Sequence, residues 1–281
     1  MNKSPMLHDK FGFIPLDSMR LLKVQGVDAK KFLQGQLTCD LETISGNYNS
    51  MGAHCNPQGR VIFLFRLFYY QDAYYFFLPR TMVEIALTAL QKYAVFFKVQ
   101  MEIASLPLCG WLGQQPSQAF AFAVPGIVPR YLLMTTHPRA ETLATTFNLW
   151  KYLDITAGLP QIYPATSEKF LPHDLNLQDI DGISFSKGCY TGQEIIARMQ
   201  HRGTIKNRLF RATITADVLP VPGSLIYYRD QQELVAGGTI IESCEESDNH
   251  YQALVATSER HKQTHLFCLE DGKSEIFFVD E

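Results

Sequence analysis

KGCYTGQE, at residues 187–194, is the stretch that most narrows the fold of this chain. Thr191 and Glu194 have the S/T-x-x-E spacing of a capping box, in which two side chains satisfy free backbone donors at a helix start. Apolar residues then recur at helical spacing, and Gly203 can end the helix. The pattern predicts a tight turn followed by a helix that ends near residue 202.

Cys189 lies just before this predicted helix start. Free backbone N–H groups and the positive end of a helix dipole converge there, and Lys187 is close by. Such surroundings favour a thiolate over a thiol. A small residue in a glycine-flanked turn accounts for the same pattern equally well. The local sequence therefore leaves a functional thiol and a structural cysteine both open.

The composition is that of an ordinary globular chain. It has 281 residues, 46% hydrophobic and 19% charged, and a net charge of −3, which excludes a globally basic nucleic-acid binder but not a local basic patch. The six cysteines are scattered without a CxxC pair, as expected in a reducing cytoplasmic compartment. Residues 1–10 lack a signal-peptide pattern, and no apolar run is long enough to span a membrane.

Mixed strands and helices are expected before a domain boundary near residue 206. Asp28 is a candidate N-cap, Thr81 and Glu84 form a second capping box, and Gln71-Asp72 is a candidate hairpin turn. The expected strands are 21–24, 61–70, 73–78, 97–103, 108–112, 120–124 and 131–135, and the expected helices are 28–38, one starting near residue 81, and one from Pro138 to Asp154.

The region after residue 206 is expected to form a small antiparallel β-barrel without a helix. Asp271-Gly272 is a strong hairpin signal within it. The expected strands are 208–215, 224–229, 233–242, 251–257, 264–269 and 274–279.

Other constellations favour structural interpretations. His54-Cys55 is poorly spaced for a structural zinc site. His261 and His265 are expected to be solvated at a barrel turn. Trp150 could stack on a heteroaromatic ring, but a core aromatic on a helix is the better local interpretation. A basic run around the signature helix, from Lys187 to Arg211, suits a solvated face, an anionic ligand tail or RNA phosphates.

The signature stretch, followed by Ala197-Arg198 and Arg202-Gly203, resembles the YgfZ family, the folate-binding branch of the glycine-cleavage T-protein superfamily. Four further segments resemble that family in the expected order: 25–40, 55–60, 157–160 and 176–177. The resemblance implies an α+β fold of three domains arranged as a cloverleaf around a hole that binds tetrahydrofolate. Two domains would be related to ferredoxin-like folds, namely 1–45 with 147–205, and 46–146, and 206–281 would be the barrel.

The resemblance also implies a function. The chain would be a cytoplasmic folate-binding accessory protein, rather than an enzyme, that supports iron–sulfur cluster assembly or repair. Its partners would be iron–sulfur enzymes such as the radical-SAM tRNA methylthiotransferase, without direct sequence-specific nucleic-acid binding and without a membrane. Cys189 would be the functional thiol and no metal ligands are expected. The folate-binding residues would be Trp150, Met19, Thr156, Lys187, Tyr190, Gln193 and Arg198.

Two departures from the superfamily separate the alternatives. T-proteins carry an acidic pair after their glycine-rich turn, whereas this chain has the apolar run Val61–Phe65. A folate-dependent aminomethyl or one-carbon transferase, the second hypothesis, would lack that carboxylate for acid–base chemistry. Many relatives also have a glutamate where Thr156 stands, although a hydroxyl can still make hydrogen bonds to a pterin. A pure scaffold with a structural Cys189 is the third hypothesis.

Overall fold

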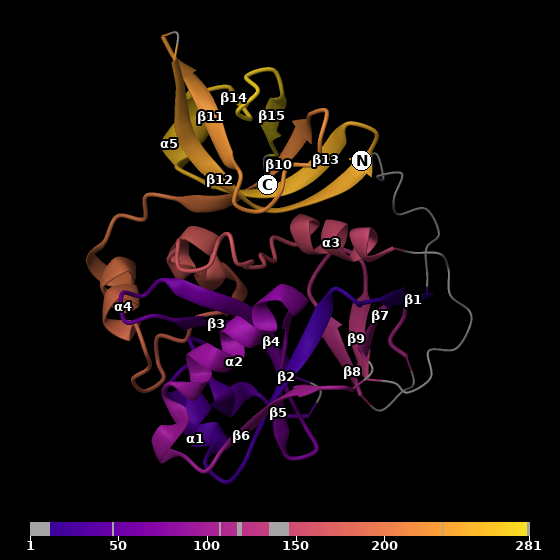
Figure 1. The fold of residues 1–281 in the computed structure, drawn as a ribbon, viewed down its shortest axis with the longest axis vertical. Helices are drawn as coiled ribbons and strands as arrows, with labels where there is room; N and C mark the ends of the chain where they lie inside the picture. Colours follow the sequence, from indigo (N-terminus) through magenta and orange to yellow (C-terminus); the bar gives the residue numbers. More distant parts are fainter. Residues whose placement is uncertain are drawn as a thin grey trace. The chain divides into compact units, whose positions relative to one another are not determined.

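Two compact units make up the chain in the computed structural model, which describes residues 12–46, 48–106, 108–116, 120–134, 146–231 and 233–279 (Figure 1). Unit 1 comprises Met1–Ser18, Leu106–Pro160 and Phe210–Glu281. Unit 2 comprises Met19–Ser105 and Gln161–Leu209. Each unit contains antiparallel sheet and helix, which confirms the predicted α+β class.

Unit 2 is built on a five-stranded antiparallel sheet in the order β3-β4-β5-β2-β6. The predicted hairpin is confirmed: Gln71 and Asp72 both have positive φ, of 44° and 57°, as a tight two-residue turn between twisted strands requires. Helix α2 packs on this sheet. The elements are β2 Met19–Gln25, β3 Asn49–Cys55, β4 Val61–Tyr70, β5 Ala73–Pro79, β6 Gln100–Ala104, α1 Ala29–Gln34, α2 Val83–Gln91 and α4 Gln193–Arg202, with short 3-10 turns at Leu41–Thr43, Arg80–Met82, Ala94–Phe96, Pro172–Leu175 and Leu177–Ile180.

Two predicted side-chain caps in unit 2 do not form, although Asp28 does occupy the N-cap position of α1. Asp28 precedes α1 but does not cap it, because its carboxylate accepts a hydrogen bond from the Lys98 amide at 2.8 Å. The capping box of Thr81 and Glu84 does not form either: a 3-10 turn, Arg80–Met82, follows β5, and α2 begins after it without a side-chain cap. Tertiary pairing and a preceding turn therefore override both local signals.

Unit 1 contains a four-stranded antiparallel sheet in the order β1-β7-β9-β8, together with helix α3. Arg130 is buried in this unit, pairs with Asp154 at 2.8 Å and lies 4.9 Å from the centre of the Trp150 ring. Pro138, the predicted helix start, lies outside the described residues. The elements are β1 Gly12–Pro15, β7 Leu108–Leu112, β8 Ala121–Val124, β9 Arg130–Met134 and α3 Phe147–Thr156.

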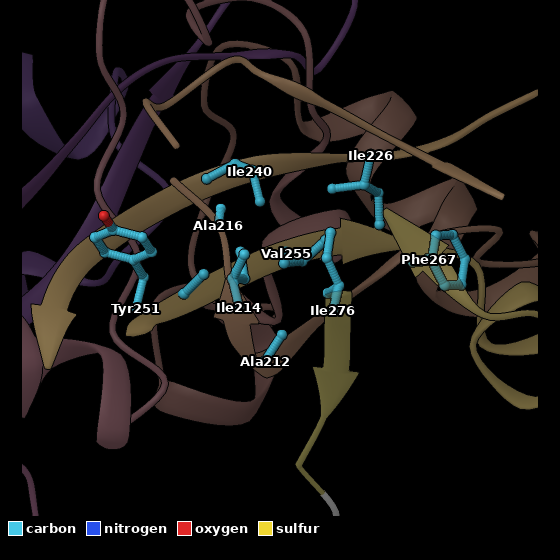
Figure 2. Packing of buried hydrophobic residues seen from close by; sticks show 10 residues of the cluster. Ala212, Ile214, Ala216, Ile226, Ile240, Tyr251, Val255, Phe267 and Ile276 are labelled. Atoms are coloured by element: carbon cyan, nitrogen blue, oxygen red, sulfur yellow. The ribbon is translucent and has the colours of Figure 1, made fainter. Parts of the chain in front are cut away.

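The predicted barrel is confirmed as a closed structure in the order β10-β13-β12-β11-β14-β15. Apolar residues from its strands fill the interior, as Figure 2 shows for Ile214, Ile226, Val255 and Ile276 among others. Helix α3 of the same unit packs against β12, and Lys151 pairs with Glu242 there at 2.7 Å. The strands are β10 Arg208–Thr215, β11 Leu225–Asp230, β12 Glu233–Ser247, β13 His250–Thr257, β14 Phe267–Cys268 and β15 Glu275–Phe278.

The expectation that the barrel region contains no helix is wrong. A short helix, α5 (Glu259–Thr264), is present, and its N-cap Ser258 accepts a hydrogen bond from the His261 amide. His261 and His265 are half-buried rather than fully solvated, because both rings pack on Tyr228, His265 in a stacked arrangement at 4.1 Å. The shortness of α5 hides its periodicity in the sequence.

The predicted division into three domains stays a prediction. Strand β2, which precedes residue 45, pairs with β5 and β6, which follow it. Residues 147–160 belong to the same unit as the barrel, and residues 161–205 belong to unit 2.

Replacement of Arg130 by Met should destabilise unit 1. Removing one member of a buried ion pair typically costs about 3–5 kcal/mol, because the other member loses its counterion. The free energy of unfolding from urea titration measures the loss. Lys23→Met is the control, because its pair with Glu102 is partly exposed and should contribute less than about 1 kcal/mol. Equal effects of the two substitutions would contradict this prediction.

Candidate functional site

The signature stretch folds as a turn that leads into α4, but not through the predicted capping box. Gly192 occupies the N-cap position with a φ of 84°, and no side chain caps the helix. Thr191 instead directs its hydroxyl to Oε1 of Gln36 at 3.1 Å, and its amide bonds the Gly35 carbonyl. The helix begins at Gln193 because a left-handed glycine, and not the threonine, sets the entry of the chain.

A second loop, residues 55–60, holds this turn by close backbone contact. A Cβ atom on Gly192 would lie 2.7 Å from the carbonyl oxygen of Asn56, and one on Gly59 would lie 3.1 Å from Cβ of Ile195. The Asn56 side chain fixes the loop by accepting hydrogen bonds from the Gln58 and Arg60 amides. The two loops therefore interlock at glycines, since no side chain fits between them.

Lys187 ties the start of the signature to the segment that follows α1. Its ammonium group donates hydrogen bonds to the carbonyls of Leu37 at 2.9 Å and Cys39 at 2.7 Å, and lies 5.2 Å from the Tyr190 ring centre. Burial lowers the pKa of Lys187 to about 8. Thr38 completes the connection, because its hydroxyl donates to the Gly182 carbonyl and its own carbonyl accepts from the Ser184 amide.

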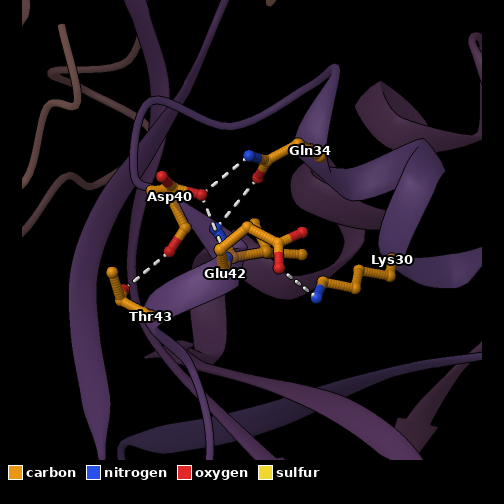
Figure 3. Close-up of polar contacts among 6 residues, drawn as sticks. Lys30, Gln34, Asp40, Glu42 and Thr43 are labelled. Carbon is orange, nitrogen blue, oxygen red and sulfur yellow. Dashed lines mark hydrogen bonds and ion pairs between the residues drawn. The ribbon is translucent and has the colours of Figure 1, made fainter. Parts of the chain in front are cut away.

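The segment that receives Lys187 is itself held by a polar network around Asp40 (Figure 3). The Asp40 carboxylate accepts hydrogen bonds from the Glu42 amide and the Gln34 side chain, which hold its pKa below the ordinary value. Lys30 pairs with Glu42 at 2.7 Å in the same network. The hydrogen bonds of Thr38 and the network around Asp40 therefore both hold the segment whose carbonyls bind Lys187.

Cys189 is presented outward by this rigid base. It is the one exposed cysteine of the six, whereas Cys39, Cys55 and the others are buried. Burial raises the pKa of Cys39 to about 12, so that this thiol stays protonated. The reactive thiolate state of Cys189 stays a prediction, and the Lys187 ammonium is bound to carbonyls rather than held free beside it.

The remaining predicted site residues fall in two units and range from buried to exposed. In unit 2, Met19 and Tyr190 are buried, Gln193 is half-buried and Arg198 is exposed. The predicted folate contacts Trp150 and Thr156 both lie on α3 of unit 1.

Trp150 occupies the core of unit 1. The side chain is 2% exposed, the Arg130 guanidinium lies over its ring, and a Cβ on Gly110 would come within 2.6 Å of it. The Thr156 hydroxyl donates to the Leu153 carbonyl of its own helix at 3.1 Å. The core aromatic that the local pattern favoured is what the structure shows.

His54 and Cys55 lie in the core of unit 2 and do not form an open site. The Nδ1 atom of His54 bonds the Gln36 carbonyl at 2.9 Å, and burial lowers the pKa of His54 to about 4, so that the ring is neutral. Burial also raises the pKa of Cys55 above its ordinary value. Among the described residues no group of three or more His, Cys, Asp or Glu side chains could hold a metal ion.

The apolar run Val61–Phe65 forms the first half of β4. Val61, Phe63, Leu64 and Phe65 are all buried, and their side chains fill the sheet core. No carboxylate occupies the position at which the acidic pair of T-proteins was expected. Acid–base chemistry of that kind has no group on this segment.

Comparison with known proteins places the chain among relatives that span nearly all of it. No family model matches. It is 34% identical over 295 aligned positions, 95% of this chain and 90% of the relative, to the tRNA-modifying protein YgfZ of Photobacterium profundum. The chain belongs to the YgfZ family. The YgfZ of Aliivibrio fischeri is 32% identical over 90% of this chain and 87% of its own length.

The fold of this YgfZ-family chain is shared more widely. The glycine cleavage system aminomethyltransferase T of Bartonella henselae superposes with a TM-score of 0.73 over 98% of this chain and 87% of that one, at 13% identity. This likeness shows the fold, and it confirms the predicted resemblance to T-proteins. Across the described residues, no helix is both long and apolar enough to cross a membrane.

Several residues that build the site were missed by sequence reasoning. Gly59, Thr38 and Gln36 hold the signature turn, yet each lies more than 130 positions before the residue that it contacts there. In the sequence, these three residues were marked only because they lie within segments 25–40 and 55–60, which resemble the family. The buried pair of Arg130 and Asp154 gave no sequence signal, because nothing local indicates which arginine is buried.

Substitution of Gly192 by Ala should destabilise unit 2 and displace Cys189. The left-handed φ and the contact with the Asn56 carbonyl both oppose a Cβ atom, and strain of this kind costs on the order of 1–3 kcal/mol. Gly188→Ala is the matched control, because nothing lies within 4 Å of a Cβ there, and its effect should stay within about 0.5 kcal/mol. Urea unfolding measures both variants. Equal losses would refute the interlocked-loop interpretation.

One thiol should react rapidly with a disulfide reagent in the native protein. Cys189 is exposed and the other five cysteines are buried, so these should react only as the chain unfolds. Cys189→Ser should abolish the fast phase, and Cys268→Ser should leave it unchanged. A fast phase that survives Cys189→Ser would contradict the assignment.

Lys187 should make stability depend on alkaline pH. Its pKa is about 8 in the fold against an ordinary 10.5, so the unfolded chain binds the proton more tightly. The contribution of Lys187 to the free energy of unfolding is therefore complete above about pH 10.5, and it is lost as the pH falls toward 8. The difference in unfolding free energy between wild type and Lys187→Met should rise over this window. A flat difference would mean that the ammonium is solvated in the fold.

Proposed function

We propose that this protein is a folate-binding accessory protein that supports iron–sulfur cluster assembly or repair, and through iron–sulfur enzymes supports tRNA modification. Membership in the YgfZ family supports the link to tRNA, because relatives at 34% and 32% identity are named tRNA-modifying proteins. We expect the protein to carry out this function in the cytoplasm. The partners would be iron–sulfur enzymes such as the radical-SAM tRNA methylthiotransferase.

The observation that carries the proposal is the exposed thiol of Cys189 on a rigid turn. Two interlocked glycine loops and the buried Lys187 hold the backbone around it. Such a thiol can meet a partner's cluster as a single ligand, or exchange with a partner's disulfide, in which its thiolate attacks one sulfur and the other sulfur leaves as a thiolate. In this proposal the cluster is cargo.

A folate-dependent aminomethyl or one-carbon transferase is the second candidate. The fold shared with an aminomethyltransferase favours it. Against it stands β4, whose first residues, Val61–Phe65, carry no carboxylate and are largely buried. General acid–base assistance would then need another group, and an assay for methylene-tetrahydrofolate formation decides between the candidates.

The family resemblance implies that the ligand is tetrahydrofolate. Trp150, the residue expected to stack on the pterin, offers the most direct test of this proposal. Stacking on a pterin would require the indole to leave its buried place beneath Arg130. The Thr156 hydroxyl would have to exchange its bond to Leu153 for one to the ligand. We therefore expect folate binding to be coupled to rearrangement of α3.

Cys189→Ala should abolish the ability of the protein to restore iron–sulfur enzyme activity in a strain that lacks it. Cys109→Ala is the control, since this buried cysteine is far less accessible and should be dispensable. The readout is activity of the tRNA methylthiotransferase in cell extracts, with protein levels measured alongside. Full restoration by Cys189→Ala would remove the thiol from the proposal.

Tetrahydrofolate should bind saturably, and Trp150→Phe should weaken it by less than about tenfold, because a phenyl ring keeps part of a stacking contact that is worth ~0.5–1.5 kcal/mol in full. Trp111→Phe is the control, since this is the other tryptophan of the chain. Calorimetric titration measures both variants. No saturable binding in the wild type would remove folate from the proposal, and equal binding by Trp150→Phe would remove only the role of Trp150.

A further inference from the structure

A pocket of about 490 Å³ opens in unit 2 behind the loop that holds the signature turn. Arg60, the last residue of that loop, lines it, and so does Met199 from α4. The Arg60 guanidinium donates a hydrogen bond to the Lys169 carbonyl at 2.5 Å, which fixes its position at the pocket wall. The pocket is thus built on the same rigid base as Cys189 but lies outside the predicted site residues.

The charge of this pocket is positive. Arg60, Lys169 and Lys206 line it against a single carboxylate, Asp174. That carboxylate is engaged, because it accepts a hydrogen bond from the Leu171 amide at 2.9 Å. Within the described part of the chain neither Lys169 nor Lys206 forms an ion pair. The ammonium groups are therefore available to an anion, and a phosphate is the natural match for an arginine with two lysines.

The rest of the lining is suited to a flat heteroaromatic ring. Phe170, Leu171 and Met199 supply apolar surface, of which Phe170 is buried. Asn207 and Thr204 add hydrogen-bonding groups, and an amide can both donate to and accept from the edge of a base. Aromatic side chains beside cationic groups are the usual combination at sites where proteins bind the unpaired nucleotides of a single strand.

We propose that this pocket binds one nucleotide, with its phosphate on Arg60, Lys169 and Lys206 and its base against Phe170, Leu171 and Met199. A free nucleoside monophosphate and an unpaired nucleotide of an RNA chain present the same chemistry. The pocket holds a single unit, so no sequence of bases is read. The site is distinct from the Cys189 thiol and from folate, and its loss would leave both of those proposals intact.

The test is calorimetric titration of the full chain with adenosine 5′-monophosphate, adenosine and inorganic phosphate. The monophosphate should bind at least roughly tenfold more tightly than either part alone, because phosphate and base contribute together. Lys169→Gln and Lys206→Gln should each weaken it roughly three- to tenfold, the range of one charge-assisted contact. Lys31→Gln, an exposed lysine of α1, is the matched control and should leave binding unchanged.

A labelled hexa-adenylate distinguishes the two sources by fluorescence anisotropy. Tighter binding than the monophosphate, with a salt slope that falls by about one for each lysine removed, identifies RNA. Equal binding identifies a free nucleotide, and either result supports the pocket. The proposal is overturned if adenosine binds as well as its monophosphate, or if both lysine variants match Lys31→Gln. It is also overturned if penta-glutamate displaces the monophosphate, since the pocket would then serve a folate tail.

Discussion

The close approach of two backbones at Gly59 and Gly192 is the constraint on which the candidate site depends. The Asn56 carbonyl lies where any side chain at Gly192 would begin, so the signature turn can rest on the 55–60 loop only with glycine there. This contact sets where α4 starts and places Arg60 at the pocket and Cys189 at the surface. The thiol and the pocket thus share one rigid base.

Lys187 shows how burial changes the role of a charged residue. Beside Cys189 in sequence it has the character of an activating cation, yet its ammonium is held by the carbonyls of Leu37 and Cys39. The low pKa follows from that burial and reflects a cost to stability that the two hydrogen bonds and the network around Asp40 offset. Lys187 therefore acts as a positioning residue, because it fixes the turn from which the Cys189 thiol projects.

The fold was largely predictable where the signal is periodic and short-range. The hairpin at Gln71-Asp72 and the strands of the barrel follow from alternation and turn residues. The caps at Asp28 and Thr191 failed because a polar side chain near a helix start caps it only if no stronger tertiary partner claims it, whereas the cap at Thr81 failed because a 3-10 turn precedes α2. The Asp28 carboxylate accepts a hydrogen bond from the Lys98 amide, and the Thr191 hydroxyl donates one to the Gln36 side chain.

The sequence by itself determined the α+β class, the barrel and the singular character of the KGCYTGQE stretch, because these rest on local periodicity and on a long, specific motif. Only the tertiary structure decided which side chains are available for chemistry. Five of the six cysteines are buried and one is exposed, and Trp150 lies under Arg130 rather than at a surface. Burial and partner choice join residues far apart in the chain, and no local pattern encodes them.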